Sequence, residues 1–303
     1  MPASRLPLRP FAIVATLIGA LSGCGGGGDN TNASDNPPLE ATPNPKSEPL
    51  RVLVPAYFYP LPGSPWEQLT RSARSQPSVG ITAIVNPSNG SGTKADAQFT
   101  QALAAFTQAG GKVIGYVPTR YGNGRYSLAD VRLHIDRYLA FYGREHISGF
   151  FLDEMAATSQ PLAFYRDIYQ YIKGLDNRLL VVGNPGTLPL ADYAAVADTL
   201  VTFEGQASAY SRFNPGPSHG WVYQYGNGKQ AMLAHDATDC RAMQTALNMA
   251  ASARSNTGWV YATDRHYDYA TNTGNPWATL PAYWEQMLGT VDALNKGSVL
   301  PSC

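Results

Sequence analysis

Two adjacent carboxylates, Asp153 and Glu154, follow directly after the apolar run that extends from Ile147 to Leu152. A short run rich in Phe and Leu is typical of a strand that is buried on both faces, as in a parallel sheet. Acids at the carboxyl end of such a strand are unusual. Two interpretations are open: an acidic turn that caps the next helix, or a catalytic carboxylate that needs a second acid elsewhere in the chain.

Glu204 is the candidate for this second acid, because it ends another apolar run that begins at Thr199. Two carboxylates at a sugar-sized cleft are the minimum equipment for glycoside hydrolysis, with one as nucleophile and the other as acid and base. Carboxyl groups about 5–5.5 Å apart give retention of anomeric configuration, whereas about 6.5–9.5 Å gives inversion. The spacing in the sequence does not determine this distance.

The elements that must position these acids form a repeating pattern of eight apolar segments with mostly helical connections. The predicted strands are 51–57, 80–86, 112–117, 147–154, 178–184, 199–204, 230–235 and 258–263. The predicted helices are 66–75, 96–109, 127–142, 162–173, 190–196, 239–253 and 277–295. This count and length predict a single (β/α)8 barrel of the α/β class. An open doubly wound sheet is the alternative, but no G-x-G-x-x-G turn follows the first strand.

Polar residues end nearly every predicted strand, and the active sites of such barrels lie at the carboxyl ends of their strands. Alternate strands contribute to the same interior layer, so the fourth and sixth strands can bring Asp153 and Glu204 face to face. We expect the neighbouring strand-end residues to bind substrate: Tyr57, Tyr116, Glu154, Asn184, His235 and Asp264. Asn86 ends the second strand in the same way.

Aromatic residues in the segments after the sixth and eighth strands could stack on sugar faces. Trp221 and Tyr223 are the first candidates, followed by Tyr225, Tyr267 and Tyr269. The alternative is that half of these rings pack against the barrel. Acids in the same segments would suit a cationic amino sugar, or they are solvated loop residues: Asp236, Asp264 and Asp268.

Other chemistries find little support in the sequence. A metal site could be drawn from His235, Asp236, Asp239, Asp264 and His266, but no closely spaced pair of histidines supports it. No G-x-S-x-G turn predicts acyl transfer, and no cofactor motif is present. We therefore expect neither a metal nor a cofactor.

The charge and cysteine content limit the partners and the compartment. The chain has 22 basic and 22 acidic residues without a basic stripe, so nucleic acid is not an expected partner, and we expect a monomer. Cys240 and Cys303 are the cysteines left after Cys24 is assigned to a lipid anchor. In an exported protein such a pair predicts a disulfide, which would fix the C-terminal tail to the domain.

The N-terminus has the layout of a secretory signal peptide. Arg5 and Arg9 precede the apolar run 11–21, which is too short to span a bilayer, and the tetrad 21–24 resembles a bacterial lipobox that ends in Cys24. Alternatively, Cys24 is an ordinary thiol in a removed signal.

Gly25 stands where inner-membrane lipoproteins carry Asp, so we expect an outer-membrane lipoprotein that faces the periplasm or the cell exterior. The predicted organisation is a signal peptide at 1–23, a disordered tether at 24–49 and the barrel domain at 50–303.

Five runs, in the same order between about residues 51 and 290, resemble the spherulin-4 family. They are 54–57, 115–122, 149–154, 184–187 and 201–204. That family is similar to glycoside hydrolases that cut biofilm exopolysaccharides such as galactosaminogalactan or Pel, within stretches of α-1,4-linked N-acetylgalactosamine or galactosamine.

The resemblance implies a (β/α)8 fold and a retaining mechanism, with Asp153 as nucleophile and Glu204 as acid/base. It leaves Glu154 open between substrate binding and tuning of Asp153. Segments 212–228 and 264–275 match no pattern of the family. A non-catalytic carbohydrate-binding or adhesion barrel is the alternative function, since a fold does not determine an activity.

Overall fold

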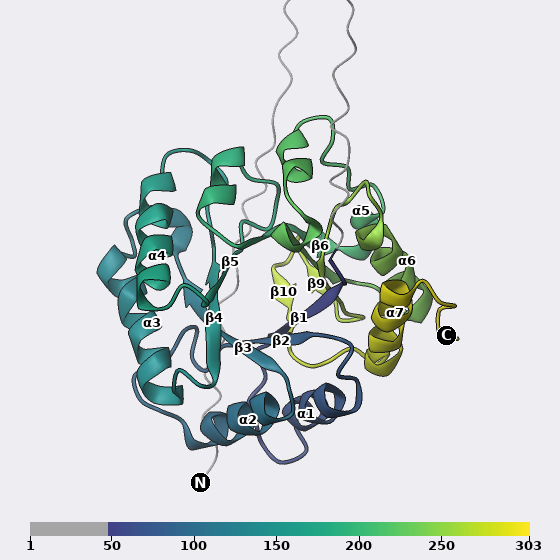
Figure 1. Cartoon of the computed structure of the whole chain (residues 1–303), viewed down its shortest axis with the longest axis horizontal. Coiled ribbons are helices and arrows are strands. Elements are labelled where there is room, and N and C mark those ends of the chain that lie inside the picture. Colours follow the sequence, from purple (N-terminus) through teal and green to yellow (C-terminus); the bar gives the residue numbers. More distant parts are fainter. Residues whose placement is uncertain (1–47) are drawn as a thin grey trace, which may run out of the picture.

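The computed structural model describes residues 48–303, in which eight parallel strands form a closed barrel in the order β1 to β8 (Figure 1). The strands are β1 Arg51–Ala56, β2 Ile81–Val85, β3 Lys112–Pro118, β4 Ile147–Asp153, β5 Leu180–Gly183, β6 Thr199–Gln206, β7 Gln230–His235 and β8 Trp259–Ala262. The first pairs with the last, since Arg51 lies opposite Trp259 in the register of β1 and β8. The single (β/α)8 barrel predicted from the sequence is confirmed.

Helices surround the barrel (Figure 1). They are α1 Pro65–Ser75, α2 Ala97–Gln108, α3 Leu128–Tyr142, α4 Leu162–Leu175, α5 Ala207–Tyr210, α6 Cys240–Ala251 and α7 Trp284–Lys296. The short 3₁₀ helices are η1 Arg120–Gly122, η2 Ala191–Ala195, η3 Gly220–Gln224 and η4 Asn227–Lys229. Helix α3 begins with a capping box: the Ser127 side chain accepts the backbone N–H of Asp130, whose carboxylate accepts the backbone N–H of Ser127.

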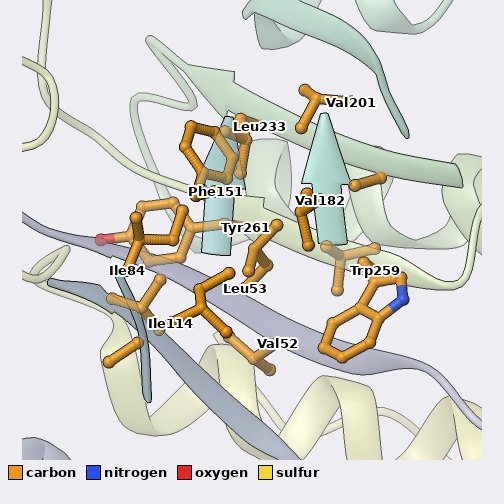
Figure 2. Close-up of a cluster of buried hydrophobic side chains, with 14 of the residues drawn as sticks. Val52, Leu53, Ile84, Ile114, Phe151, Val182, Val201, Leu233, Trp259 and Tyr261 are labelled. Atoms are coloured by element: carbon orange, nitrogen blue, oxygen red, sulfur yellow. The ribbon is translucent and has the colours of Figure 1, made fainter. Parts of the chain in front are cut away.

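Apolar side chains from strands around the whole barrel form one buried cluster (Figure 2). Leu53, Ile84, Phe151 and Val182 have no solvent exposure, and Leu233 is 2% exposed. Each such side chain contributes roughly 1.5–3 kcal/mol when it is fully buried. This packed interior fixes the strand ends, and so the positions of the polar residues that follow them.

The structure corrects three details of the predicted elements. The last helix begins at Trp284 and not at Trp277, because Pro281 lies between them and disfavours a helical residue before it. The segment predicted as a helix at 190–196 forms the 3₁₀ helix η2. A small hairpin of β9 Tyr267–Asp268 and β10 Thr273–Gly274 was not predicted, since its strands have two residues each.

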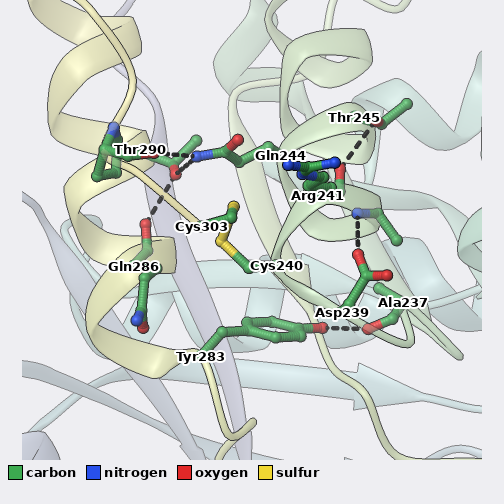
Figure 3. Close-up of a disulfide and its surroundings, with 12 residues drawn as sticks. Ala237, Asp239, Cys240, Arg241, Gln244, Thr245, Tyr283, Gln286, Thr290 and Cys303 are labelled. Carbon is green, nitrogen blue, oxygen red and sulfur yellow. Dashed lines mark hydrogen bonds between the residues drawn. A yellow bond between two sulfur atoms is a disulfide. The ribbon is translucent and has the colours of Figure 1, made fainter.

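A disulfide joins Cys240, the first residue of α6, to Cys303 at the end of the chain (Figure 3). The side-chain amide of Gln244 in α6 donates to the carbonyl of Pro301 at 2.8 Å and holds the same tail. The pairing that the cysteine count predicted is therefore present, and it fixes the C-terminal tail against α6.

The predicted signal peptide, Cys24 and all but the last residues of the predicted tether lie outside the described residues. Glu48 already belongs to the barrel surface, because its amide donates to Oδ1 of Asn227 at 2.8 Å and its carbonyl accepts from Nδ2 of the same residue at 2.8 Å. Between residues 48 and 303, no helix combines the length and the apolar character needed to cross a membrane.

Candidate active site

The neighbouring strands β4, β5 and β6 bring two carboxylates and one amide together. Asp153 ends β4, Asn184 follows β5 directly, and Glu204 lies near the end of β6. Nδ2 of Asn184 donates to Oδ1 of Asp153 at 2.7 Å and to Oε2 of Glu204 at 2.7 Å. Because both oxygens lie within hydrogen-bond distance of one nitrogen, they are at most about 5.4 Å apart, twice 2.7 Å.

The turn after β5 determines which way the Asn184 amide faces. Its Oδ1 accepts the backbone N–H of Gly186 at 2.9 Å, so its nitrogen is the atom that faces the two acids. The carbonyl of Gly186 in turn accepts the N–H of Glu204 at 3.1 Å. Gly186 has φ +66°, a left-handed conformation that glycine adopts without steric penalty. The local sequence Asn-Pro-Gly therefore places one amide between two strands.

Asp153 receives a second donor from β3. The hydroxyl of Tyr116 donates to its Oδ2 at 2.7 Å, and both residues are buried, with Asp153 6% exposed. The ring of Tyr57 packs edge-on against Tyr116 with 5.6 Å between centroids. Burial first, and then the charges of Asp153 and Glu204, raise the pKa of Tyr57, which therefore lies close to the pair. We call Tyr57, Tyr116, Asp153, Asn184 and Glu204 the carboxylate side.

The environments of the two acids differ in a way that assigns the proton. Burial and then the negative charge of Asp153 raise the pKa of Glu204 to about 7, against one hydrogen bond from Asn184. Burial also raises the pKa of Asp153, but hydrogen bonds from Tyr116 and Asn184 and the charge of Arg120 oppose this. Asp153 thus has more groups that favour its ionised form, and the proton of the pair goes to Glu204.

Glu154 faces a different partner. Its Oε1 lies 2.8 Å from Nη1 of Arg120, and its side chain is 10% exposed. Burial raises the pKa of Glu154, while Arg120 acts in the opposite direction. The sequence singled out Glu154 but not Arg120, although Arg120 lies in the run 115–122, directly after the third strand.

Beside the acids, on the strand that pairs with β6 and in the segments that follow β7 and β8, four residues form what we call the histidine side: His235, Asp236, His266 and Tyr269. His235 contacts Oδ2 of Asp236 through Nδ1 at 2.5 Å and the hydroxyl of Tyr269 through Nε2 at 2.7 Å. The other oxygen of Asp236 lies 2.5 Å from Nδ1 of His266. Burial lowers the pKa of His235, opposed by Asp236. Asp236 is therefore the carboxylate partner of His235.

Tyr269 connects the histidine side to the acid pair. A methyl group built on Gly205, the residue after Glu204, would lie 3.8 Å from the Tyr269 hydroxyl. Burial and then the charge of Glu204 raise the pKa of Tyr269 to about 12, although its side chain is 44% exposed. A half-exposed ring beside Glu204 is placed to contact a ligand of the pair.

Three predicted site residues are not brought to the pair. Trp221 and Tyr223 are each 8% exposed, and the Tyr223 hydroxyl donates to the carbonyl of Arg254 at 2.7 Å. These rings belong to the buried apolar core, and Tyr223 reaches the segment between α6 and β8, which corrects the expectation that they stack on sugars. Asp264 has Arg265 as its ionic neighbour at 3.5 Å, and its charge helps to raise the pKa of Tyr261 and of Tyr283.

The described residues 48–303 contain no group of three or more His, Cys, Asp or Glu side chains that could hold a metal ion.

The fold defines a single (β/α)8 barrel. It is similar to Aspergillus clavatus Sph3, solved in complex with GalNAc, with a TM-score of 0.66 and 23% identity over 80% of this chain and 98% of that one. An endo-β-1,4-mannanase from Thermotoga petrophila matches with a TM-score of 0.51 and 9% identity, covering 84% of this chain and 78% of the other.

The chain belongs to the spherulation-specific family 4, whose family profile matches residues 51–291. Spherulin-4 of Physarum polycephalum is 32% identical over 257 residues, which cover 82% of this chain and 72% of that protein. The resemblance to the spherulin-4 family found in the sequence is thus confirmed.

Proposed function

We propose that the protein is an endo-acting glycoside hydrolase that cleaves α-1,4-linked N-acetylgalactosamine or galactosamine exopolysaccharide of a biofilm matrix, with retention of configuration. The observation that carries this proposal is the single Asn184 amide that holds the buried Asp153 carboxylate and the half-buried Glu204 carboxylate within reach of one sugar unit. The solved complex of Sph3 with GalNAc supports the choice of sugar.

The spacing of the carboxylates supports retention. The two oxygens bonded to Asn184 are at most about 5.4 Å apart, twice 2.7 Å, whereas inverting enzymes separate their carboxyl groups by about 6.5–9.5 Å to admit a water. A nucleophile at the shorter distance attacks the anomeric carbon itself.

The mechanism assigns one role to each acid. Glu204, protonated below about pH 7, donates its proton to the glycosidic oxygen while ionised Asp153 attacks the anomeric carbon. The C–O bond to the leaving sugar breaks and a glycosyl ester forms on Asp153. Glu204, now a carboxylate, takes a proton from water, and the resulting hydroxide displaces Asp153 and restores both groups.

The test is incubation with a partially deacetylated polymer of α-1,4-linked N-acetylgalactosamine. Mass spectrometry detects the released oligosaccharides, and ¹H NMR identifies the first anomer that forms. Wild type should release α-anomeric oligomers, and Asp153→Asn and Glu204→Gln should release none while remaining folded. Asp167→Asn, an exposed acid on α4, is the matched control. A first product of inverted configuration would refute retention. Tight binding of the polymer by wild type without cleavage would favour the non-catalytic binding barrel.

We also propose that the domain is displayed as an outer-membrane lipoprotein through Cys24, which rests on the lipobox-like tetrad 21–24. Labelled palmitate fed to an expressing bacterium should enter the wild-type chain and not Cys24→Ala. Absence of label in wild type would refute the anchor.

A further inference from the structure

The turn after β3 and the residue after β4 share a rare backbone conformation. Arg120, Tyr121 and Glu154 have φ values of 50°, 57° and 53°, in the left-handed region that non-glycine residues seldom adopt. Such residues persist where the surrounding structure fixes them, and they cluster at functional sites. The contacts that fix these three residues therefore indicate what the arrangement does.

Glu154 makes most of those contacts. Its carbonyl accepts the N–H of Tyr121 at 2.7 Å and the hydroxyl of Thr119 at 2.9 Å. Its carboxylate accepts the backbone N–H of Arg120 at 3.3 Å and the guanidinium of the same residue at 2.8 Å. One carboxylate thus holds both the backbone and the charge of Arg120, so the guanidinium is kept at the rim of the site.

The Arg120 guanidinium is placed differently with respect to Asp153 and to Glu204. Arg120 acts on Asp153 and Glu154, where its charge opposes the rise in pKa that burial causes. Arg120 is bound to Glu154, the residue that follows Asp153 in the chain, whereas Glu204 lies on β6, two strands away from β4 in the barrel. The cation therefore favours the ionised form of Asp153, while burial and the charge of Asp153 raise the pKa of Glu204.

We propose that Glu154 is a positioning residue: it holds the Arg120 guanidinium beside Asp153, so that Asp153 stays ionised while Glu204 carries the proton. This inference rests on the proposed function and resolves the role of Glu154 in favour of tuning the nucleophile. Glu154 needs no contact with the sugar in this role.

The other titratable groups around Asp153 are neutral or anionic and cannot replace the cation. They are Tyr57 of β1, Tyr116 of β3, Tyr121 of η1, Glu154 after β4 and Glu204 of β6.

The first test measures Asp153 in the full-length protein without substrate, so it is readable even if no polymer is cleaved. The carboxyl ¹³C signal of Asp153, assigned by its loss in Asp153→Asn, is titrated in variants of Arg120. Arg120→Met should raise the pKa of Asp153 by about one unit or more, because it removes a nearby opposite charge. Arg120→Lys, which keeps the charge, should stay near wild type.

Arg125→Met is the matched control, since Arg125 is an exposed arginine of the same loop whose backbone N–H donates to Oδ1 of Asn123. It should leave the pKa of Asp153 unchanged. An unchanged value in Arg120→Met, or an equal rise in Arg125→Met, would overturn the proposal.

The second test is a double-mutant cycle with Glu154. When Arg120 is replaced by Met, Glu154 becomes an unpaired negative charge next to Asp153, so Glu154→Gln in that background should lower the pKa of Asp153 again. In activity assays the apparent pKa at which kcat/KM falls on the acid side should be higher in Arg120→Met than in wild type. In the double variant this apparent pKa should return part of the way to the wild-type value. If the double variant is instead less active than either single one, Glu154 acts on the substrate and the positioning role is wrong.

Discussion

The carboxylate side and the histidine side of the site are built in different ways. On the carboxylate side, Asp153, Asn184 and Glu204 come from three adjacent strands and are bonded across them. On the histidine side, Asp236 and Tyr269 come from segments beyond the strands, and Tyr269 is 44% exposed. Side chains fixed by a sheet and buried have their pKa values set by the fold, whereas side chains on loops can adapt to a ligand. We therefore expect chemistry on the first side and substrate recognition on the second.

The largest effect should come from the amide that joins the two acids. Asn184→Ala removes a donor from both Asp153 and Glu204 and leaves the two carboxyl groups without the amide that bridges them. We expect kcat to fall about 10²–10³-fold, as when one preorganised donor is removed from an active site. Steady-state kinetics measure this, with exposed Asn177→Ala as the control. A loss of less than about threefold would show that catalysis by Asp153 and Glu204 does not depend on the Asn184 bridge.

The pH dependence should follow the carboxylate side. Glu204 must be protonated to act as acid and its pKa is about 7, so kcat/KM should fall as pH rises above about 7. Ionised Asp153 is needed as well, so the rate should also fall at low pH. Histidine side chains can also change charge in this pH range. The variant His266→Asn therefore tests whether the pH dependence comes from Glu204 or from the histidine side. In His266→Asn the fall of kcat/KM at high pH should be unchanged. If this fall disappears in the variant, a group of the histidine side and not Glu204 causes the pH dependence.

The same raised pKa predicts a stability effect at Glu204. Folding favours the protonated form, so its ionisation destabilises the folded protein progressively above pH 4.5 and fully above about pH 7. Glu204→Gln removes this penalty. Its Tm should exceed that of wild type at pH 8 and equal it near pH 4, as measured by calorimetry. An equal Tm of the two proteins at pH 8 would show that ionised Glu204 does not destabilise the folded protein.

The smallest effects are expected at Tyr269. Tyr269→Phe keeps the ring and removes the hydroxyl that contacts His235. We expect KM to rise about two- to fivefold with kcat nearly unchanged, since one hydrogen bond is lost. Tyr269→Ala should raise KM about tenfold through loss of ring contact. A fall in kcat as large as that of Asn184→Ala would show that the histidine side takes part in the chemistry.

Much of the fold could be predicted because each strand is a short apolar run with a polar residue at its carboxyl end. The same pattern indicated Asp153, Asn184 and Glu204, since a closed barrel brings its strand ends to one face. The prediction was wrong for Trp221 and Tyr223, although Trp and Tyr are residue types that can stack on sugars. Nothing local in the sequence distinguishes a ring that faces solvent from one that packs on a neighbouring helix.

The eight-stranded periodicity, the acids at two strand ends and the Asn-Pro-Gly run after the fifth strand could be recognised in the sequence, because they depend on alternation and local backbone preference. The folded barrel was needed to show that one amide nitrogen bonds both acids, that Arg120 is held by Glu154, and that Tyr269 lies near Glu204. Those contacts join residues from different strands and loops, and their distances are set by closure of the barrel and not by spacing along the chain.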